Sequence, residues 1–227
     1  MKIIKEKKNN FGIFIQARLG SNRFPNKILQ KINKTETVLD YMIKRILRVF
    51  RNKDVFLLTT KKKQDKKFVK IAQKYKIIFF SGSEKNLISR YLNCAKKFKI
   101  NNIVRLTSDC PLIDPYLVEK FLFFARKNKK YDYFTNCAPY KKRTYAVGSD
   151  IEIFIYEKLK NINLKNISNY EKEHITPYLL KKKFYHFKNC NNDSDLRFTV
   201  DYPEDLNLLK IIIKQIEKKN KFYVYKD

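Results

Sequence analysis

Residues 11–29 read FGIFIQARLGSNRFPNKIL, and they decide the fold class of this chain. The first seven form a short apolar run that predicts a buried strand, and a cationic loop follows at once. The same succession of apolar run and loop recurs along the first half of the chain, with helical patterns in between. The predicted strands are 11–17, 55–60, 77–80 and 102–107, and the predicted helices are 38–50, 65–75, 84–98 and 115–127.

This alternation predicts a parallel sheet covered by helices on both faces and connected by right-handed crossovers. After about residue 130 the pattern is less regular. Strand candidates there are 131–135, 143–147, 150–156, 196–201 and 222–225, and helix candidates are 156–162, 170–182 and 203–218. No repeat and no Gly/Ser-rich linker divides the chain, so we expect a single α/β domain over residues 1–227.

Composition excludes several classes of protein. Hydrophobic residues make up 44% of the 227 residues, which is too many for a disordered chain and sufficient for a large core. No apolar run approaches the ~18 residues of a transmembrane helix, and the N-terminal segment lacks the cleavage site of a signal peptide. We therefore expect a cytoplasmic location and no membrane insertion.

The net charge of +29 suggests an anionic partner such as nucleic acid. However, 41 of the 51 basic residues are lysines, and they are spread along the chain rather than gathered in one arm. This distribution favours solvated lysine-rich faces, and we expect no specific nucleic-acid partner. The four cysteines share no CxxC spacing, which argues against a zinc site and for buried reduced thiols.

The first loop carries the clearest candidate site. Ligands of open α/β sheets bind beyond the carboxyl ends of the strands, and Arg18, Arg23 and Lys27 follow the first predicted strand. Guanidinium and ammonium groups bind polyphosphate oxygens, and Gly20 allows backbone amides to approach a phosphate. The loop is not a P-loop, and a generic basic loop in a lysine-rich protein is the alternative.

Two carboxylates follow predicted strands elsewhere. Asp109 comes after the strand 102–107, and Asp201 ends the segment 196–201. Together with phosphate oxygens they would suit a Mg²⁺ ion bound to a nucleotide. Asp109 could instead belong to a turn before Pro111, and Asp201 could cap the helix that Pro203 opens.

The loop sequence resembles the R-x-x-S-x-R-x-P-x-K signature of sugar-activating cytidylyltransferases of the acylneuraminate and 3-deoxy-manno-octulosonate types. The closest resemblance is to the spore coat polysaccharide biosynthesis branch. Further segments support it in the right order, namely 82–91, 104–115, 131–136, 143–154, 171–180 and 194–206. The resemblance implies a Rossmann-like three-layer nucleotidyltransferase fold with a mixed, mostly parallel sheet. It also implies a homodimer, a nucleotide-binding half over 11–130, and an acceptor-sugar half with dimerisation elements over 131–227.

The resemblance further implies roles for individual residues. Arg18, Lys27 and Asp109 match catalytic positions, and Asp109 and Asp201 match the ligands of the Mg²⁺ cofactor. The implied nucleotide-binding residues are Ala17, Arg18, Ser21, Arg23, Lys27, Ser83 and Thr107. The candidates for binding the sugar are Arg143, Asp150, Glu152, Glu173, His174 and Arg197, and for each of them a contact that merely supports the fold is the alternative. Tyr202 and the residues flanking Gly148 depart from the family pattern on the sugar side.

The expected function is therefore transfer of CMP from CTP to an acidic sugar or sugar phosphate, with release of pyrophosphate. A nucleotidyltransferase that uses another nucleoside triphosphate is one alternative. A glycosyltransferase-like enzyme is another, since Asp193-Ser194-Asp195 matches a DxD string, although its Asn-rich surroundings predict a turn. A basic nucleic-acid-binding protein is the most remote alternative, because no known RNA or DNA motif is present.

Overall fold

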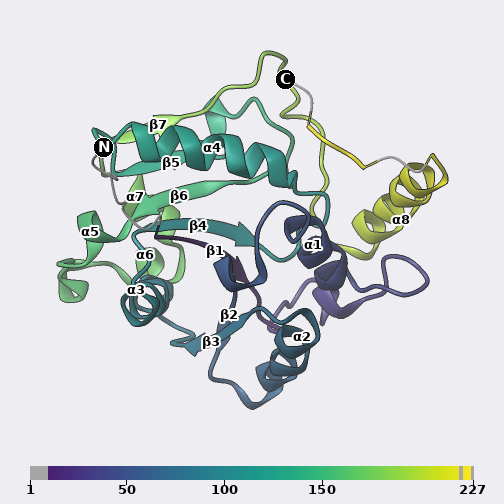
Figure 1. Cartoon of the computed structure of the whole chain (residues 1–227), viewed down its shortest axis with the longest axis horizontal. Coiled ribbons are helices and arrows are strands. Elements are labelled where there is room, and N and C mark those ends of the chain that lie inside the picture. The colour runs from purple at the N-terminus through teal and green to yellow at the C-terminus, as the bar shows by residue number, and fades with distance from the viewer. Residues whose placement is uncertain (1–9, 220–221, 226–227) are drawn as a thin grey trace, which may run out of the picture.

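The structure of the chain is a computed structural model that describes residues 10–219 and 222–225. Its centre is one seven-stranded sheet in the order β3-β2-β1-β4-β6-β5-β7 (Figure 1). The strands are β1 (Phe11–Gln16), β2 (Val55–Thr60), β3 (Ile78–Gly82), β4 (Asn102–Thr107), β5 (Tyr133–Thr135), β6 (Glu152–Ile155) and β7 (Phe184–His186). The first four pair in parallel, and β6 runs antiparallel to both of its neighbours. The expected mixed, mostly parallel sheet is confirmed.

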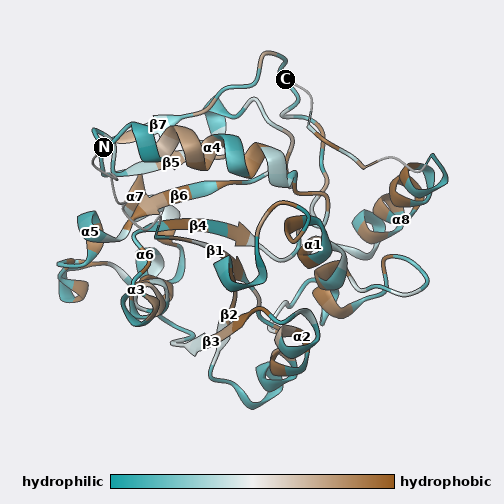
Figure 2. Ribbon diagram, in the orientation of Figure 1, coloured by the Kyte–Doolittle hydropathy of each residue, from teal (hydrophilic) through white to brown (hydrophobic). Residues whose placement is uncertain are grey.

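Helices cover both faces of the sheet and make three layers. The helices on one face are α1 (Val38–Ile46), α2 (Lys67–Tyr75) and α4 (Pro115–Lys127). Those on the other face are α3 (Leu87–Phe98), α5 (Tyr156–Leu159), α6 (Asn169–Glu173) and α7 (Ile175–Leu179). Figure 2 shows hydrophobic residues along the strands and on the sides of the helices. None of the helices among the described residues is both long and apolar enough to span a membrane.

The period of two in β1 explains why both faces need cover. Ile13 and Ile15 are fully buried in the core beneath α1, α2 and α4, whereas Phe14 is fully buried in the core beneath α3. A strand that is apolar on both sides is typical of a parallel sheet between two helical layers. Because β1 and β4 run parallel, their carboxyl ends lie at the same edge of the sheet, where loops can form a site.

The last helix, α8 (Pro203–Lys218), lies at the periphery beside α1 (Figure 1). Pro203 occupies its first turn, and the side chain of Asp205 accepts the amide of the N-cap residue Tyr202 at 2.8 Å. The helix packs through Leu206, Leu209 and Ile213 onto a small core that also includes Val200. This packing holds the segment before the helix, which includes Asp201, against the sheet.

The second half departs from the sequence predictions in several places. The predicted helix 170–182 is divided into α6 and α7 at His174, whose backbone is extended. Pro177 explains the break, because it has no N–H and its ring disfavours a helical turn before it. The predicted strands 143–147 and 196–201 form only one isolated bridge, between Val147 and Arg197.

Two further predictions were wrong, one of a C-terminal strand and one of buried cysteines. Residues 222–225 do not form a strand, since the backbone of Tyr223 and Tyr225 pairs with the side chains of Arg45 and Asp114. The short strand β7 had no prediction. Among the cysteines, Cys94 and Cys110 are buried and Cys137 is half-buried, but Cys190 is exposed, so the expectation of buried thiols fails there.

Candidate functional site

A cleft of about 440 Å³ opens beyond the carboxyl ends of β1 and β4. It brings together residues from the first loop, the loop after β4 and the segment before α8. Its lining consists of Gln16, Arg18, Gly20, Ser21, Asn22, Arg23, Lys27, Ile28, Thr107, Ser108, Asp109 and Asp201. Eight of the residues singled out from the sequence thus share one cleft, although they come from three distant segments.

The cationic loop is anchored by backbone contacts on both sides. The amide of Ala17 donates to the carbonyl of Leu58 on β2 at 2.8 Å, so β1 continues into the loop without a break. The amide of Leu19 donates to Oδ1 of the buried Asp65 at 3.1 Å. Asn26 then takes a left-handed conformation with φ of 55°, which turns the chain into the 3₁₀ turn that starts at Lys27. These contacts hold the backbone of the loop in place on both sides of its cationic side chains.

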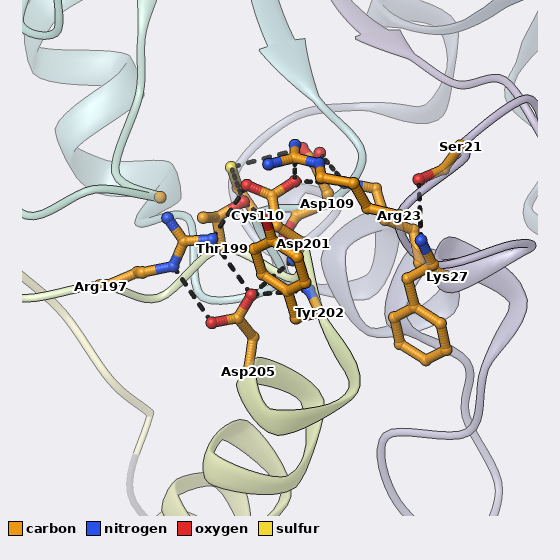
Figure 3. A network of polar contacts seen from close by, with 12 residues as sticks. Ser21, Arg23, Lys27, Asp109, Cys110, Arg197, Thr199, Asp201, Tyr202 and Asp205 are labelled. Atoms are coloured by element: carbon orange, nitrogen blue, oxygen red, sulfur yellow. Dashed lines mark hydrogen bonds and ion pairs between the residues drawn. The ribbon is translucent and has the colours of Figure 1, made fainter.

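Lys27 lies between the two predicted metal ligands (Figure 3). Its Nζ is 2.6 Å from Oδ2 of Asp109 and 2.8 Å from Oδ1 of Asp201, and only 12% of its side chain is exposed. Burial by itself would lower the pKa of Lys27, but the two carboxylates outweigh burial and raise it. Lys27 is therefore a cation over the whole physiological range of pH.

Asp201 is the centre of a wider charge network. Its Oδ1 also accepts from Nη2 of Arg23 at 2.8 Å, and its Oδ2 accepts from Nη2 of Arg197 at 3.0 Å. Burial opposes the ionisation of Asp201, yet Lys27, Arg23 and Arg197 hold its pKa below the ordinary value. Asp201 is not the cap of α8, because Asp205 accepts the amides of Asp201 and Tyr202 instead.

The two carboxylates are close enough to share one cation, but two protein ligands alone do not complete the coordination of a divalent ion. One ammonium group already contacts an oxygen of each, so the pair can share a cation. Within residues 10–219 and 222–225, however, no group of three or more Asp, Glu, His or Cys side chains could hold a metal ion. Mg²⁺ prefers six oxygen ligands and keeps several waters or phosphate oxygens. The site therefore suits an ion that arrives with a phosphorylated ligand.

The remaining nucleotide-binding candidates differ in their placement. Thr107 lines the cleft and contacts Sγ of Cys110, and Ala17 is fully buried just behind it. Ser83 is not among the residues that line the cleft. Its carbonyl accepts from the buried Arg90, and its hydroxyl accepts from the amide of Asn86 at 3.1 Å. The buried Arg90 thus holds the loop after β3 by a hydrogen bond to its backbone.

Three of the sugar-binding candidates have partners inside the fold. Arg143 pairs with both oxygens of Asp150, at 2.6 and 3.0 Å. Glu152 is 2% exposed, forms an ion pair with Arg105, and accepts a hydrogen bond from the hydroxyl of Tyr133 at 2.5 Å. Contacts of this kind are expected of residues that support the fold, which is the alternative to a role in sugar binding.

The other three candidates lie closer to the cleft or to solvent. Nη1 of Arg18 is 3.8 Å from Oε1 of Glu173, which links the cationic loop to the end of α6. His174 is exposed, and its ring packs on Tyr170 with the centroids 4.9 Å apart. Arg197 is part of the carboxylate network, since it pairs with both Asp201 and Asp205.

Sequence reasoning missed several residues of this region. Asp205 could have been found, since a carboxylate at the third position of a helix, three residues after the N-cap, is a common cap. Arg90, Arg105 and Asp65 match no local motif, because Arg90 donates to a backbone carbonyl and the other two contact residues distant in the chain. The DxD string is confirmed as a turn, with the amide of Leu196 donating to the carbonyl of Asp193 at 3.0 Å.

Comparisons with known proteins agree on one family. The family model described as cytidylyltransferase matches residues 13–227. The structure of a cytidylyltransferase from Leptospira borgpetersenii is 37% identical, with a TM-score of 0.80 over 96% of this chain and 98% of that one. The spore coat polysaccharide biosynthesis protein SpsF of Bacillus subtilis is 26% identical over 91% of this chain and 88% of its own.

A more distant structure shares the fold. It is a CMP:2-keto-3-deoxy-manno-octonic acid synthetase complexed with CTP. It has 18% identity and a TM-score of 0.66, and the match covers 91% of this chain and 99% of that chain.

Proposed function

The chain belongs to the cytidylyltransferase family and is a CTP-dependent nucleotidyltransferase, and from this premise we propose that it transfers CMP to an acidic sugar or sugar phosphate. The products are the CMP-sugar and pyrophosphate. We also propose Mg²⁺ as its cofactor, and a cytoplasmic homodimer that serves the synthesis of a surface polysaccharide. The name of the Bacillus subtilis relative supports the last point.

The observation that carries the proposal is the pairing of a cationic loop with two carboxylates in one cleft. Arg18, Arg23 and Lys27 come from the loop after β1, and Asp109 and Asp201 face them from two other segments. A triphosphate needs cations along its length and a divalent ion at its reacting phosphate. This cleft offers groups for both needs.

In the proposed reaction an oxygen of the acceptor attacks the α-phosphorus of CTP in line. A new P–O bond forms, the bond from the α-phosphorus to the bridging oxygen breaks, and pyrophosphate leaves with the electron pair. If the attacking oxygen is a hydroxyl, its proton is lost to solvent or to a basic group. Such transfers depend on positioning and electrostatic stabilisation more than on a nucleophilic side chain.

The residues of the cleft divide this work. Arg18 and Lys27 would neutralise the charge that builds on the departing pyrophosphate. Asp109 and Asp201 would hold Mg²⁺, which when bound supplies charge stabilisation at the α-phosphate. Thr107 lines the cleft and Ala17 lies between the lining residues Gln16 and Arg18, and the nucleoside would sit against this part of it.

The proposal of an acidic acceptor draws on the distant relative that makes a CMP-linked keto acid. Exposed groups near the cleft could contact such an acceptor. Glu173 at the end of α6 contacts Arg18, whose side chain is 43% exposed, and the exposed His174 follows Glu173 in the chain. Arg18 could therefore exchange Glu173 for the carboxylate of an acceptor or for a phosphate of CTP.

The test is an assay of pyrophosphate release with CTP, Mg²⁺ and a panel of acceptors that includes nonulosonic acids, 3-deoxy-octulosonic acids and sugar phosphates. We expect release with CTP and at least one acidic sugar, and a CMP-sugar of matching mass. Release that needs a preformed nucleotide-sugar instead, with a nucleoside diphosphate as product, would contradict the proposal. Light scattering of the purified protein tests the homodimer.

A further inference from the structure

Lys27 occupies the position between Asp109 and Asp201 where a shared cation belongs. Its ammonium group contacts one oxygen of each carboxylate, at 2.6 and 2.8 Å (Figure 3). The side chain is largely buried, and both contacts are charge-assisted hydrogen bonds, which are short and strong. A second cation cannot approach the same two oxygens while this ammonium group remains there.

The charge balance around the carboxylates points the same way. Asp201 contacts three cationic side chains, which are Lys27, Arg23 and Arg197. The carboxylates of Asp109, Asp201 and Asp205 are matched by these three positive charges. The cluster is therefore neutral as a whole, and it lacks the excess negative charge that would attract a divalent ion from solution.

The described residues also provide no third protein ligand of the usual kinds beside this pair. An ion placed on two carboxylates alone would need the oxygens of a bound phosphate to complete its coordination. A triphosphate would bring those oxygens. Its negative charge would also offer the Lys27 ammonium group a new partner within the same cleft, because Lys27 lines that cleft.

We propose that Lys27 is an exchangeable counter-ion, which excludes divalent metal from Asp109 and Asp201 until the nucleotide arrives. When CTP binds with its metal, Lys27 leaves the carboxylates for the triphosphate, and the carboxylates become free to act as ligands. Metal and nucleotide then bind with strong positive coupling, and the nucleotide-free protein holds no metal. The inference rests on the proposed function, since it takes the cleft to be the site of metal-bound CTP.

The test measures Mn²⁺ binding to the nucleotide-free protein by water proton relaxation, which separates protein-bound from free ion. The variants are wild type, Lys27→Met and Lys27→Arg, and the matched control is Lys158→Met. Lys158 is likewise paired with a carboxylate, that of Asp132, but it is half-exposed and lies on α5 away from the cleft. Lys27→Met and Lys158→Met each lose one positive charge, whereas Lys27→Arg keeps it.

Wild type, Lys27→Arg and the Lys158 control should bind Mn²⁺ weakly without nucleotide. Lys27→Met should bind it at least about tenfold more tightly, because a positive charge at contact distance is gone. Equal affinity of Lys27→Met and wild type, with both folded by circular dichroism, would overturn the inference. The proposed function fails separately, when wild type binds no Mn²⁺ even with CTP and releases no pyrophosphate.

A second measurement uses the unmodified protein, in case Lys27→Met does not fold. The ammonium signal of Lys27 in a ¹H–¹⁵N NMR spectrum, assigned with Lys27→Arg, should stay unchanged when Mg²⁺ alone is added. It should move when Mg²⁺ and CTP are added together. A shift with Mg²⁺ alone, saturating at micromolar concentration, would show that the metal reaches the carboxylates without nucleotide and would overturn the inference.

Discussion

The backbone amide of Val200 donates a hydrogen bond to the carbonyl of Asp109 at 2.8 Å. This single bond joins the loop after β4 to the segment before α8, and each segment carries one of the two carboxylates of the cleft. The hydroxyl of Thr199 supports it with a contact of 3.4 Å to the same carbonyl. The relative position of Asp109 and Asp201 is thus set by the backbone rather than by their side chains.

The carboxylate of Asp109 should be essential for turnover. Asp109→Asn keeps the size of the side chain and the backbone bond to Val200, but it removes the charge that faces Lys27. We expect pyrophosphate release to fall by roughly 10²–10³, the usual cost of removing one charged group from a preorganised site. Asp132→Asn, which breaks the remote pair with Lys158, should keep normal turnover. Near-normal turnover of Asp109→Asn would show that the Asp109 carboxylate has no role in the reaction.

Two residues of the cationic loop, Lys27 and Arg18, should matter to turnover to a similar extent. Lys27→Ala and Arg18→Ala should each lower turnover by roughly 10²–10³ in the same assay. Lys158→Ala serves as the control, since it removes a paired cation that does not line the cleft. A variant of Lys27 or Arg18 with near-normal turnover would contradict the assignment of that residue to the triphosphate.

Gly148 should be intolerant of a side chain. Its φ is +100°, and a Cβ built there would lie 2.6 Å from the backbone carbon of Phe198 and 2.7 Å from the amide nitrogen of Thr199. Gly148→Ala should cost about 1–3 kcal/mol in the free energy of unfolding, measured by urea denaturation. Gly20→Ala is the matched control, because a Cβ there meets no atom within 4 Å. Equal stability of the two variants would contradict the expected clash of a side chain at position 148 with the backbone of Phe198 and Thr199.

Asp40 should make the stability of the fold depend on acidic pH. The carboxylate accepts from Lys74 at 2.8 Å and from the hydroxyl of Tyr75 at 2.7 Å. Burial opposes its ionisation, but these bonds and those from Thr37 outweigh burial and lower the pKa of Asp40 from 3.8 to about 2. A lowered pKa means that the stabilisation is present above the ordinary value and is lost as pH falls from about 4 to about 2.

Asp40→Asn should therefore be less stable than wild type by about 2 kcal/mol at neutral pH, and the difference should shrink on acidification. Urea denaturation at a series of pH values measures it. Asp54→Asn, which breaks the more exposed pair with Arg51, should cost less than about 1 kcal/mol. A difference for Asp40→Asn that stays constant down to pH 2.5 would contradict the pKa assignment.

The sequence predicted the first half of the fold well because each element there carries its own signal. β2 and α4 have the predicted bounds, and the capping box of Thr37 and Asp40 starts α1. In the second half, backbone pairing depends on distant partners. The amide of Val200 pairs with Asp109, and the backbone of Val147 pairs with the 196–198 segment, so the alternating residues there form no regular strand.

The same distinction applies to the site. Arg18 and Lys27 after the first predicted strand, and Asp109 after the strand 102–107, could be identified because charged residues at the ends of parallel strands meet at one edge of the sheet. The contact of Arg197 with Asp201 and Asp205, and the ion pair of Glu152 with Arg105, could not be predicted. Arg105 and Glu152 face one another only because β4 and β6 pair in antiparallel register. Local sequence contains no information about that register.

The central claim is that the cleft binds CTP together with a divalent ion, and thermal unfolding with Mg²⁺ and each of CTP, UTP, GTP and ATP tests it most directly. A ligand at ~100 times its dissociation constant stabilises the fold by ~2.7 kcal/mol, which shifts the midpoint of a chain of this size by several degrees. We predict such a shift with CTP and Mg²⁺ and a much smaller one with the other nucleotides or with Mg²⁺ alone. Equal shifts with all four nucleotides, or none with CTP, would contradict the claim.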